Sequence, residues 1–501
     1  MIINDIIEKT AQKYGEKTGL IFKDQTFAFD SIREHSFKLA NALRGCGAKK
    51  GDRIGIYLPN CPEYVFSYLA IFCLGAVGVP LDFMLKEDEL VSCLGHSETK
   101  ILIALNKSDV DLEAVWKQLP QLEKLILLDG NDFDAVCYGD LMAHVSSEFL
   151  PVDIKDSDPA LIMYTSGTTG KPKGILLNYK HLDGSPKAME YFVDLTDKDI
   201  KLCPLPLSHI GGFIYIQNML LFGITLVLMD RFNPMHFLEN VHKYNVTCFH
   251  IVPPMYNAIL TLKHIENFDL SSLRWVVVFG APSSPEILER FHKYCLNAVL
   301  LNGWGMTETC PPNTVTPLKN SDNIASVGKP SPFSKIRIVG DDGKDMSACA
   351  IGEIVISGEY IMQEYYKDPE ATAEMKRPDG LYTGDLGRFD ENGFLYIVGR
   401  KKEMIKVGGQ LVYAPEVEAA LYKHPAVVEA AVIGVPDKLR GETIKAFVVL
   451  KEGESVNVDD LREFMKEHLA HFKVPSSIEI VKDLPKNRTG KIDKVVLQKK
   501  I

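Results

Sequence analysis

Short apolar runs alternate with helical patterns along the chain, and this alternation restricts the fold more than any other feature. The runs are rich in β-branched residues and bounded by Gly, Pro or Asp, which is typical of buried strands. They are DRIGIYL, TKILIAL, LEKLILL, ITLVLM, RWVVVFG and LNAVLLNGWG. Helical patterns such as SIREHSFKLANALRGCG and SPEILERFHKYCL lie between them. The alternation predicts an α/β protein with mainly parallel sheets covered by helices.

The character of the sequence changes after about residue 330. The segments KIRIVGDDGKDMSACAIGEIVISG and RFDENGFLYIVGR contain the turn dipeptides DG and NG, and they predict hairpins. Helix and strand patterns then alternate to the C-terminus, which favours a small α+β domain. A chain of 501 residues is also too long for one hydrophobic core. We therefore expect a large domain at residues 1–401 and a small domain at residues 402–501.

Charge excludes some classes of function and leaves another open. The formal net charge of −10 argues against nucleic acid as the main partner. The final segment, KDLPKNRTGKIDKVVLQKKI, is nonetheless basic. Such a tail on an acidic protein indicates either a small anionic ligand or an ordinary solvated surface.

The cysteines and the apolar segments indicate a cytoplasmic protein. Ten cysteines occur without a CxxC pair, which disfavours both a disulfide framework and a zinc site. The N-terminus lacks the basic start and apolar block of a signal peptide. The most apolar run, Phe66–Leu81, is too short to span a membrane and is interrupted by Gly and Pro. We expect it to form a buried helix that leads into a buried strand; peripheral contact with a membrane is left open.

The segment YTSGTTGKPKG, from Tyr164 to Gly174, has the composition of a phosphate-binding loop. Its glycines let the backbone approach a ligand, its hydroxyl groups suit phosphate oxygens, and Lys171 and Lys173 add positive charge. Apolar residues on both sides predict that it joins two strands. The P-loop of nucleoside triphosphatases does not fit, because its first glycine is misplaced and Pro172 replaces the magnesium-binding hydroxyl.

This loop resembles the phosphate-binding signature of the adenylate-forming superfamily, which includes acyl-CoA synthetases, adenylation domains of peptide synthetases and firefly-type luciferases. Other segments resemble the remaining family signatures, in the family's order and over essentially the whole chain. They are PLPLSHIGGF, FGAPSSPEI, LNGWGMTET, YTGDLGRFDENGFLYIVGRKKEMIKVGG and LPKNRTGKI. The resemblance implies a large N-terminal domain with two mainly parallel sheets and a distorted β-barrel, followed by a small, mobile α+β domain.

The resemblance also implies which residues bind ATP and the other cosubstrate. These are Thr165, Ser166, Gly167, Thr168, Thr169, Gly170, Lys173, Gly280, Ala281, Trp304, Gly305, Asp385, Arg400, Lys406, Gly408 and Gly409. Trp304 occupies the place of a tyrosine that packs on adenine in the family, and an indole ring can also stack. Asp385 would accept hydrogen bonds from both ribose hydroxyls, and Arg400 would bind the ribose beside it.

The catalytic groups are assigned by the same resemblance. Lys491 matches the catalytic lysine, whose flexible ammonium reaches the acyl carboxylate and the α-phosphate. Thr307 would contact the α-phosphate, and Glu308 would bind Mg²⁺ because a hard cation needs carboxylate oxygens. His209 would be the gate between the acyl group and the nucleotide. Lys402 would be the hinge that brings Lys406 and the neighbouring glycines into the site for a second reaction.

The implied reaction joins a carboxylic acid to coenzyme A through an acyl-adenylate, with ATP and Mg²⁺. The acyl pocket is expected at His209, Gly211, Gly212 and Phe213, with the two glycines leaving room beside the gate. The segment IGGFIYIQNML contains no carboxylate, which disfavours an amino acid because its buried ammonium would need a partner. We favour a medium- or long-chain fatty acid, with an aryl acid related to benzoate or cinnamate as the alternative.

The acceptor and several other classes of function remain open on the sequence. Only ten residues follow Lys491, too few for a carrier domain, so we expect free coenzyme A to be the acceptor. A stand-alone enzyme that loads a carrier protein is the alternative. A luciferase-like oxygenase, an inactive binding protein and a P-loop ATPase that releases ADP are the other hypotheses. A monomer or a homodimer is expected.

Overall fold

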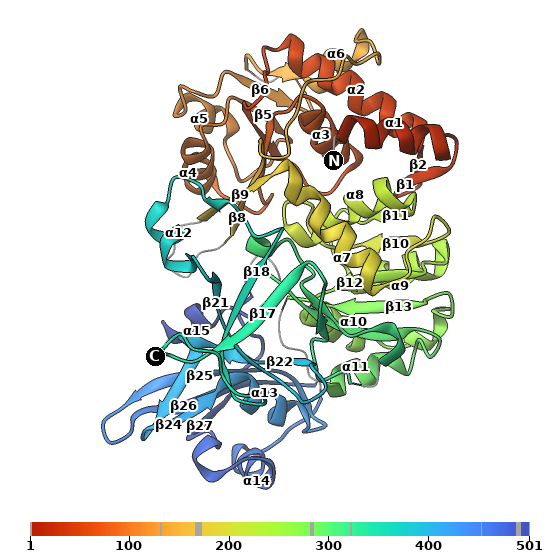
Figure 1. Cartoon of the computed structure of the whole chain (residues 1–501). Helices are drawn as coiled ribbons and strands as arrows, with labels where there is room; N and C mark the ends of the chain where they lie inside the picture. Colours follow the sequence, from red (N-terminus) through yellow and green to blue (C-terminus); the bar gives the residue numbers. More distant parts are fainter. Residues whose placement is uncertain are drawn as a thin grey trace. The chain divides into compact units, whose positions relative to one another are not determined.

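The computed structural model describes residues 3–130, 133–165, 173–280, 285–320, 323–451, 453–486 and 492–499 (Figure 1). The chain divides into two compact units. Unit 1 consists of Met1–Phe249, Gly305–Asn313 and Gly358–Lys376. Unit 2 consists of His250–Trp304, Thr314–Ser357 and Arg377–Ile501. The chain therefore passes between the units several times, and each unit is built from segments that are distant in sequence.

One sheet of unit 1 has the strand order β19-β9-β8-β4-β3-β5-β6-β7. Its strands are β3 (Arg53–Tyr57), β4 (Val77–Pro80), β5 (Ile101–Ala104), β6 (Lys124–Leu127), β7 (Val136–Cys137), β8 (Pro159–Thr165), β9 (Lys173–Asn178) and β19 (Glu364–Tyr365). The strands from β8 to β7 pair in parallel, whereas β9 pairs antiparallel with β8 and β19. An antiparallel edge on a parallel sheet is common in α/β proteins.

A second sheet in unit 1 brings together strands from both ends of that unit. It contains β1 (Thr18–Phe22), β2 (Gln25–Ala28), β10 (Ile200–Cys203), β11 (Thr225–Leu228) and β12, which begins at Cys248. β1 and β10 pair in parallel with β11, and β2 folds back antiparallel on β1. The helices of unit 1 are α1 (Ile3–Tyr14), α2 (Phe29–Gly45), α3 (Pro62–Cys73), α4 (Glu87–Ser97), α5 (Leu112–Lys117), α6 (Tyr138–Ala143), α7 (Gly184–Phe192), α8 (Ile210–Phe222), α9 (Pro234–Tyr244) and α12 (Pro369–Met375).

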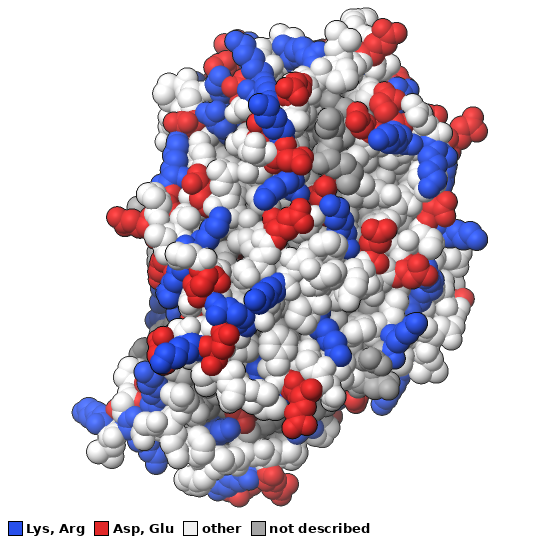
Figure 2. Space-filling model, viewed as in Figure 1, with Lys and Arg blue, Asp and Glu red and all other residues white. Residues whose placement is uncertain are grey.

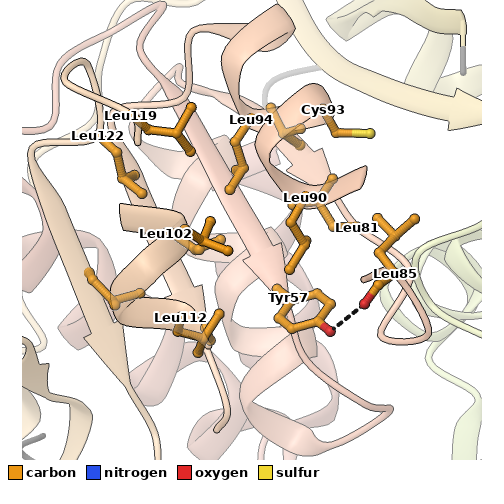
Figure 3. Close-up of a cluster of buried hydrophobic side chains, with 14 of the residues drawn as sticks. Tyr57, Leu81, Leu85, Leu90, Cys93, Leu94, Leu102, Leu112, Leu119 and Leu122 are labelled. Atoms are coloured by element: carbon orange, nitrogen blue, oxygen red, sulfur yellow. Dashed lines mark hydrogen bonds between the residues drawn. The ribbon is translucent and has the colours of Figure 1, made fainter. Parts of the chain in front are cut away.

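Leucine side chains of α4 and α5 fill one face of the first sheet (Figure 3). Leu90 and Leu94 of α4 pack with Leu102 of β5 in this cluster, and all three are almost completely buried. The hydroxyl of Tyr57, at the end of β3, donates a hydrogen bond of 2.9 Å to the carbonyl of Leu85 (Figure 3). A buried phenol is thereby satisfied, and the loop between β4 and α4 is fixed to the sheet.

Unit 2 holds the middle of the chain and its C-terminal part. Its first strands are β13 (Trp275–Val278), β14 (Val299–Trp304), β15 (Thr314–Val315) and β16 (Lys329–Pro330), accompanied by α10 (Pro253–Leu260) and α11 (Pro285–His292). A separate sheet contains β17 (Ser334–Val339), β18 (Gly352–Gly358), β20 (Lys376–Arg377), β21 (Gly380–Phe389) and β22 (Leu395–Arg400). β21 pairs antiparallel with both β18 and β22, so its residues are held from two sides.

The C-terminal sheet is covered by its own helices. Its strands are β23 (Met404–Val407), β24 (Gln410–Tyr413), β25 (Val427–Asp437), β26 (Gly441–Leu450) and β27 (Ser477–Ile480). Its helices are α13 (Ala414–Tyr422), α14 (Val458–His468) and α15 (Lys494–Gln498). Val417 and Leu421 of α13 and Leu461 and Met465 of α14 are fully buried in one hydrophobic cluster with the sheet. The expected small α+β domain therefore has a core of its own.

The structure confirms the predicted α/β class with a smaller C-terminal domain, whereas the division at residue 402 stays a prediction. The six apolar runs form strands β3, β5, β6, β11, β13 and β14, and the run Phe66–Leu81 lies in helix α3 and strand β4 as expected. One hairpin differs from its prediction. Val339 bridges Asp345 across the DG turn, but β18 begins only at Gly352, so a longer loop joins β17 to β18. The NG hairpin between β21 and β22 is confirmed.

Two further properties concern the surface and the cysteines. On the face drawn in Figure 2, basic and acidic side chains are interspersed over the described surface. Within the described ranges, no helix combines the length and the apolar character that crossing a bilayer requires. All ten cysteines lie in the described ranges as free thiols, and Cys349, in the loop between β17 and β18, is exposed.

Candidate active site

The phosphate loop is carried by a hairpin. β8 ends at Thr165 and β9 begins at Lys173, and these two residues are paired across the antiparallel ladder. The prediction that the loop joins two strands is therefore confirmed, and no helix follows the loop as the P-loop of nucleoside triphosphatases requires. The predicted residues Ser166, Gly167, Thr168, Thr169 and Gly170 lie outside the described residues.

Tyr164 anchors the end of β8 to helix α4. Its hydroxyl donates to the carbonyl of Cys93 at 3.0 Å and lies 2.8 Å from Nδ1 of His96. Burial lowers the pKa of His96, which favours the neutral imidazole at neutral pH. The position of the loop base thus depends on α4, an element that the loop sequence does not indicate.

Glu308 is held by a tyrosine from a distant segment. Its carboxylate accepts a hydrogen bond of 2.8 Å from the hydroxyl of Tyr365 in β19, and both side chains are buried. Burial and the neighbouring Glu308 raise the pKa of Tyr365 well above its usual value, so the phenol remains a donor. The ammonium of Lys173 lies 4.9 Å from the centre of the Tyr365 ring. Tyr365 therefore links the hairpin of the phosphate loop to the predicted metal ligand, a role that the sequence did not reveal.

The backbone around Glu308 is fixed by close packing. Thr307 begins the 3₁₀ helix η3 (Thr307–Thr309), and the Glu308 carbonyl accepts from the Met362 backbone at 2.7 Å. A Cβ at Gly305 would lie 2.5 Å from Cβ of Pro311, so only glycine fits there. A carboxylate in a fixed orientation is the kind of ligand that Mg²⁺ prefers, and Glu308 fits that role by its chemistry and its setting.

His209 has an acidic partner that its own segment does not contain. It lies at the N-cap of α8, and its Nε2 is 3.1 Å from Oδ2 of Asp82, which follows β4. The side chains of His209 and Asp82 are 25% and 13% exposed, so the pair is partly shielded from solvent. The segment around His209 contains no carboxylate of its own, but Asp82, which is 127 residues away along the chain, places one beside His209.

The pocket predicted beside His209 is only partly supported by the packing. A Cβ at Gly212 would lie 2.1 Å from the carbonyl oxygen of Pro206, so the prediction that Gly212 leaves room for substrate is wrong. Because Gly212 has no side chain, the backbone at Pro206 can approach it closely. At Gly211 a Cβ would meet Cδ1 of Leu205 at 3.3 Å, a tight but less severe contact. Phe213 is buried, with its ring centre 4.8 Å from that of Tyr68.

Asp385, in unit 2, receives donors on both carboxylate oxygens. The indole Nε1 of Trp304 donates to Oδ2 at 2.8 Å, and Nε of Arg400 lies 3.0 Å from Oδ1. Trp304 and Asp385 are each 7% exposed. Three residues that the sequence assigned to ribose and adenine are therefore brought together, although Trp304 is 81 residues from Asp385.

The conformation of the backbone just before Asp385 sets the position of this residue. Gly384 has φ +72°, a left-handed conformation that favours glycine, and its N–H donates to Oε1 of Glu353 at 3.1 Å. The Asp385 N–H bonds the Thr383 hydroxyl at 3.1 Å, and that hydroxyl donates to the Ile354 carbonyl at 2.8 Å. Thr383, Gly384 and Asp385 thus form a local irregularity of β21 that orients the Asp385 carboxylate. Gly280 also has a positive φ of 91°, and the adjacent Ala281 lies outside the described residues.

The predicted hinge and the glycine loop lie at the start of the C-terminal sheet. Lys402 is exposed within the 3₁₀ helix η5 (Lys401–Glu403), directly after β22. Gly408 and Gly409 have φ of 57° and 85° and form the two-residue turn between β23 and β24. Two left-handed residues are what a type I′ hairpin turn requires. Lys406 precedes this turn with an exposed side chain.

Lys491 lies outside the described residues, but the residues on each side of it are well anchored. Lys486 and Ile492 form an antiparallel bridge, and the Lys486 ammonium is 2.7 Å from Glu429. Lys494 forms ion pairs with Glu403 and Glu418. Part of the basic tail is therefore used in ion pairs within the protein.

The arrangement forms two groups of side chains, one in each unit. In unit 1, Tyr365 joins Glu308 to Lys173, and His209 is paired separately with Asp82. In unit 2, Asp385 joins Trp304 to Arg400. A cationic group beside a buried acid suits a polyphosphate with its counter-ion, and an acid held by two donors suits a diol.

Comparison with protein families and with relatives identifies the chain's family. Residues 7–366 match the AMP-binding enzyme model, and residues 416–491 match the model of the AMP-binding enzyme C-terminal domain. A long-chain-fatty-acid–CoA ligase of Bacillus subtilis (strain 168) is 32% identical over 524 residues, which cover 98% of this chain and 93% of that protein.

Solved structures agree with this match. An anthranilate CoA ligase in complex with anthranoyl-AMP has a TM-score of 0.94 at 27% identity, over 100% of this chain and 97% of that chain. The o-succinylbenzoate coenzyme A synthetase of Bacillus subtilis, in complex with ATP and magnesium ion, has a TM-score of 0.84 at 30% identity, over 97% and 98% of the two chains. The chain therefore belongs to the AMP-binding enzyme family, within the adenylate-forming superfamily that its phosphate loop resembles.

Proposed function

We propose that this AMP-forming acid–thiol ligase activates a medium- or long-chain fatty acid with ATP and transfers the acyl group to coenzyme A. One observation carries the assignment of the nucleotide site. Asp385 is a buried acid whose two oxygens are oriented by Trp304 and Arg400, as a receptor for ribose hydroxyls must be. The family resemblance assigns the phosphates to the hairpin loop, Lys173 and Thr307.

In the first step, a carboxylate oxygen of the acid attacks the α-phosphorus of ATP, and the bond to pyrophosphate breaks. Two anions must approach each other, so the ammonium groups of Lys491 and Lys173 would lower their repulsion and stabilise the developing charge. Asp385 and Arg400 would hold the ribose, and Trp304 would lie against the adenine. Mg²⁺ held by Glu308 would neutralise phosphate charge.

In the second step, the thiol sulfur of coenzyme A attacks the acyl carbon, the carbon–oxygen bond to AMP breaks, and the thiol proton passes to solvent. Lys491 is no longer needed and would obstruct the thiol. A rotation at Lys402 of the domain formed by residues 402–501 against residues 1–401 would exchange it for the turn that contains Lys406, Gly408 and Gly409. One site would thereby serve two reactions.

The class of acid is inferred from the relatives and from the residues that follow His209. The relative from Bacillus subtilis acts on a long-chain fatty acid, and α8 is apolar and buried after His209. An aryl acid is the second candidate, because the structural neighbours include ligases of anthranilate and o-succinylbenzoate. Asp82 beside His209 adds a reason to include acids with an amino substituent.

Coenzyme A is the proposed acceptor, and a free carrier protein is the alternative. We also propose that the enzyme acts in the cytoplasm as a monomer or a homodimer. These proposals name the acceptor, the compartment and the oligomeric state in which the proposed reaction takes place.

A pyrophosphate-release assay over a panel of carboxylic acids tests the proposal. The panel contains fatty acids of graded chain length, benzoate and cinnamate derivatives, anthranilate and amino acids, each with and without coenzyme A. We expect release with fatty acids, AMP as the nucleotide product and a thioester only when coenzyme A is present. Release of ADP, or thioester formation only on an added carrier protein, would contradict the proposal.

Two variants separate the half-reactions. Lys491→Ala should abolish acid-dependent exchange of pyrophosphate into ATP, whereas Lys406→Ala should leave that exchange intact and lower thioester formation from the adenylate about tenfold. Lys423→Ala, an exposed lysine of the same domain, is the control. Normal exchange by Lys491→Ala would remove the role assigned to that lysine.

A further inference from the structure

The indole of Trp304 is placed to act on the nucleotide through Asp385. Its Nε1 donates to Oδ2 of Asp385 at 2.8 Å, and both residues are buried, each 7% exposed as a whole residue. A ring that acts only by stacking on adenine needs an open face and no donor. Here the donor of the ring is already committed to the acid that is assigned to the ribose.

The two donors of Asp385 approach different oxygens. Trp304 bonds Oδ2, and Arg400 lies beside Oδ1 at 3.0 Å. A carboxylate has about four acceptor sites, so each oxygen keeps room for one ribose hydroxyl after these bonds are made. With both oxygens bound, rotation of the carboxyl group about its bond to Cβ is restricted. The acid is therefore oriented before the nucleotide arrives.

Arg400 alone cannot fix this orientation as firmly. Its side chain is 53% exposed, whereas that of Asp385 is 10% exposed. Exposed ion pairs are weakened by solvent, while a hydrogen bond from a buried donor to a charged acceptor is among the stronger ones. Trp304 also lies at the end of β14, where its backbone is paired with Thr314, so its ring is carried by a regular strand.

We propose that Trp304 is a positioning residue that sets the ribose selectivity of the enzyme by orienting Asp385. This inference rests on the proposed nucleotide site, and it gives the tryptophan at this position a function that a stacking phenylalanine could not supply. The predicted consequence is specific. Loss of the indole N–H should weaken the use of nucleotides that carry ribose hydroxyls more than the use of those that lack them.

The test compares ATP with 2′,3′-dideoxy-ATP in the adenylation half-reaction. For each enzyme, the ratio of kcat/KM for the two nucleotides is measured by pyrophosphate release at saturating acid. In Trp304→Phe, which keeps an aromatic ring, we expect this ratio to fall about tenfold, as the loss of a hydrogen bond to a charged group implies. If Trp304 only stacks on adenine, both nucleotides lose the same factor and the ratio is unchanged, which would overturn the inference.

Asp385→Asn separates failure of the inference from failure of the site. This variant should lower the ratio by itself, and Trp304→Phe added to it should lower the ratio no further. If Asp385→Asn leaves the ratio unchanged, the proposed ribose site is wrong. If Asp385→Asn lowers the ratio but Trp304→Phe does not, only the positioning role is wrong.

Two controls address folding. Trp275→Phe removes another buried indole of unit 2, and it should leave the ratio unchanged. Incorporation of β-(3-benzothienyl)alanine at position 304 keeps the shape of the indole but replaces the N–H by sulfur. This near-isosteric change should lower the ratio as Trp304→Phe does, and an unchanged ratio in this variant would also overturn the inference.

Discussion

Tyr365 connects groups that would otherwise depend on flexible side chains. Its phenol donates to Glu308, and its ring lies against the ammonium of Lys173. A hydrogen bond to a buried carboxylate contributes about 1.5–3 kcal/mol, and it also fixes where the acceptor points. The position of the predicted metal ligand is therefore set by a residue outside every family signature named above.

Tyr365→Phe should weaken the use of Mg²⁺ more than it weakens folding. Without the hydroxyl, Glu308 loses its orienting donor, and we expect the Mg²⁺ concentration for half-maximal pyrophosphate release to rise about tenfold. The measurement is a Mg²⁺ titration at fixed ATP, with a melting curve to check the fold. Tyr366→Phe is the control, because the ring of Tyr366 packs against His96 instead. Equal Mg²⁺ requirements in both variants would contradict this role.

The sequence predicts some residues of the candidate site but not the residues that hold them in place. Glu308, Asp385 and Trp304 were identified from their motifs, because each motif is a short segment with a fixed order. Tyr365, which lies 57 residues from Glu308, and Asp82, which lies 127 residues from His209, carry no local signal. Their roles arise from packing between distant segments, which no single stretch of the sequence contains.

At the scale of elements, α15 is tied to the 3₁₀ helix that contains the predicted hinge residue and to α13. Lys494 begins this helix and binds Glu418 of α13 at 2.8 Å and Glu403 of η5 at 3.4 Å. Burial alone would lower the pKa of Lys494, but the two carboxylates outweigh it and raise this pKa. The element that contains the predicted hinge residue and the helix α13 that follows it are thus both fastened to α15 by one cation.

Lys494→Met should destabilise the C-terminal domain by about 3 kcal/mol, because it leaves two carboxylates facing a site without their cation. We expect a lower midpoint of urea unfolding for this domain and faster limited proteolysis near the C-terminus. Lys499→Met removes an exposed lysine close to the same helix and is the control. If the two variants unfold at the same urea concentration, the ion pairs contribute nothing measurable.

Individual strands were the part of the fold that the sequence predicted best. Strands such as β5 and β13 are short, β-branched and buried on both faces, so their pattern identified them. The hairpin from β17 to β18 was misjudged because its DG turn closes only the bridge from Val339 to Asp345. A turn dipeptide specifies a local reversal of the chain, but it does not specify where the partner strand begins.

At the scale of the whole molecule, the stability of unit 1 includes the cost of a buried charge. Lys201 in β10 is fully buried, and burial lowers its pKa from 10.5 to about 8 against the opposing influence of Cys248, Cys203 and Asp199. The cost of the charge is fully present below about pH 8. Between about pH 8 and 10.5 the unfolded chain binds more protons than the folded one, so the free energy of unfolding rises with pH.

Lys201→Met should therefore raise the melting temperature at pH 7 by several degrees, equivalent to about 2 kcal/mol after the loss of the cation–π contact with Tyr215. The difference from wild type should shrink as the pH approaches 10. Scanning calorimetry at a series of pH values measures both effects. Lys198→Met, at an exposed position before the same strand, should change neither. A lower melting temperature at pH 7 for Lys201→Met would contradict the assigned cost.

The distribution of thiols makes this enzyme convenient for optical experiments. Cys349 is exposed, whereas Cys46 and Cys137 are half-buried and the remaining cysteines are buried. A maleimide dye should therefore react first at Cys349, in the loop after β17. With a second cysteine introduced on an exposed position of α14, a donor–acceptor dye pair could test the proposed rotation of the small domain during turnover, in single molecules and in real time.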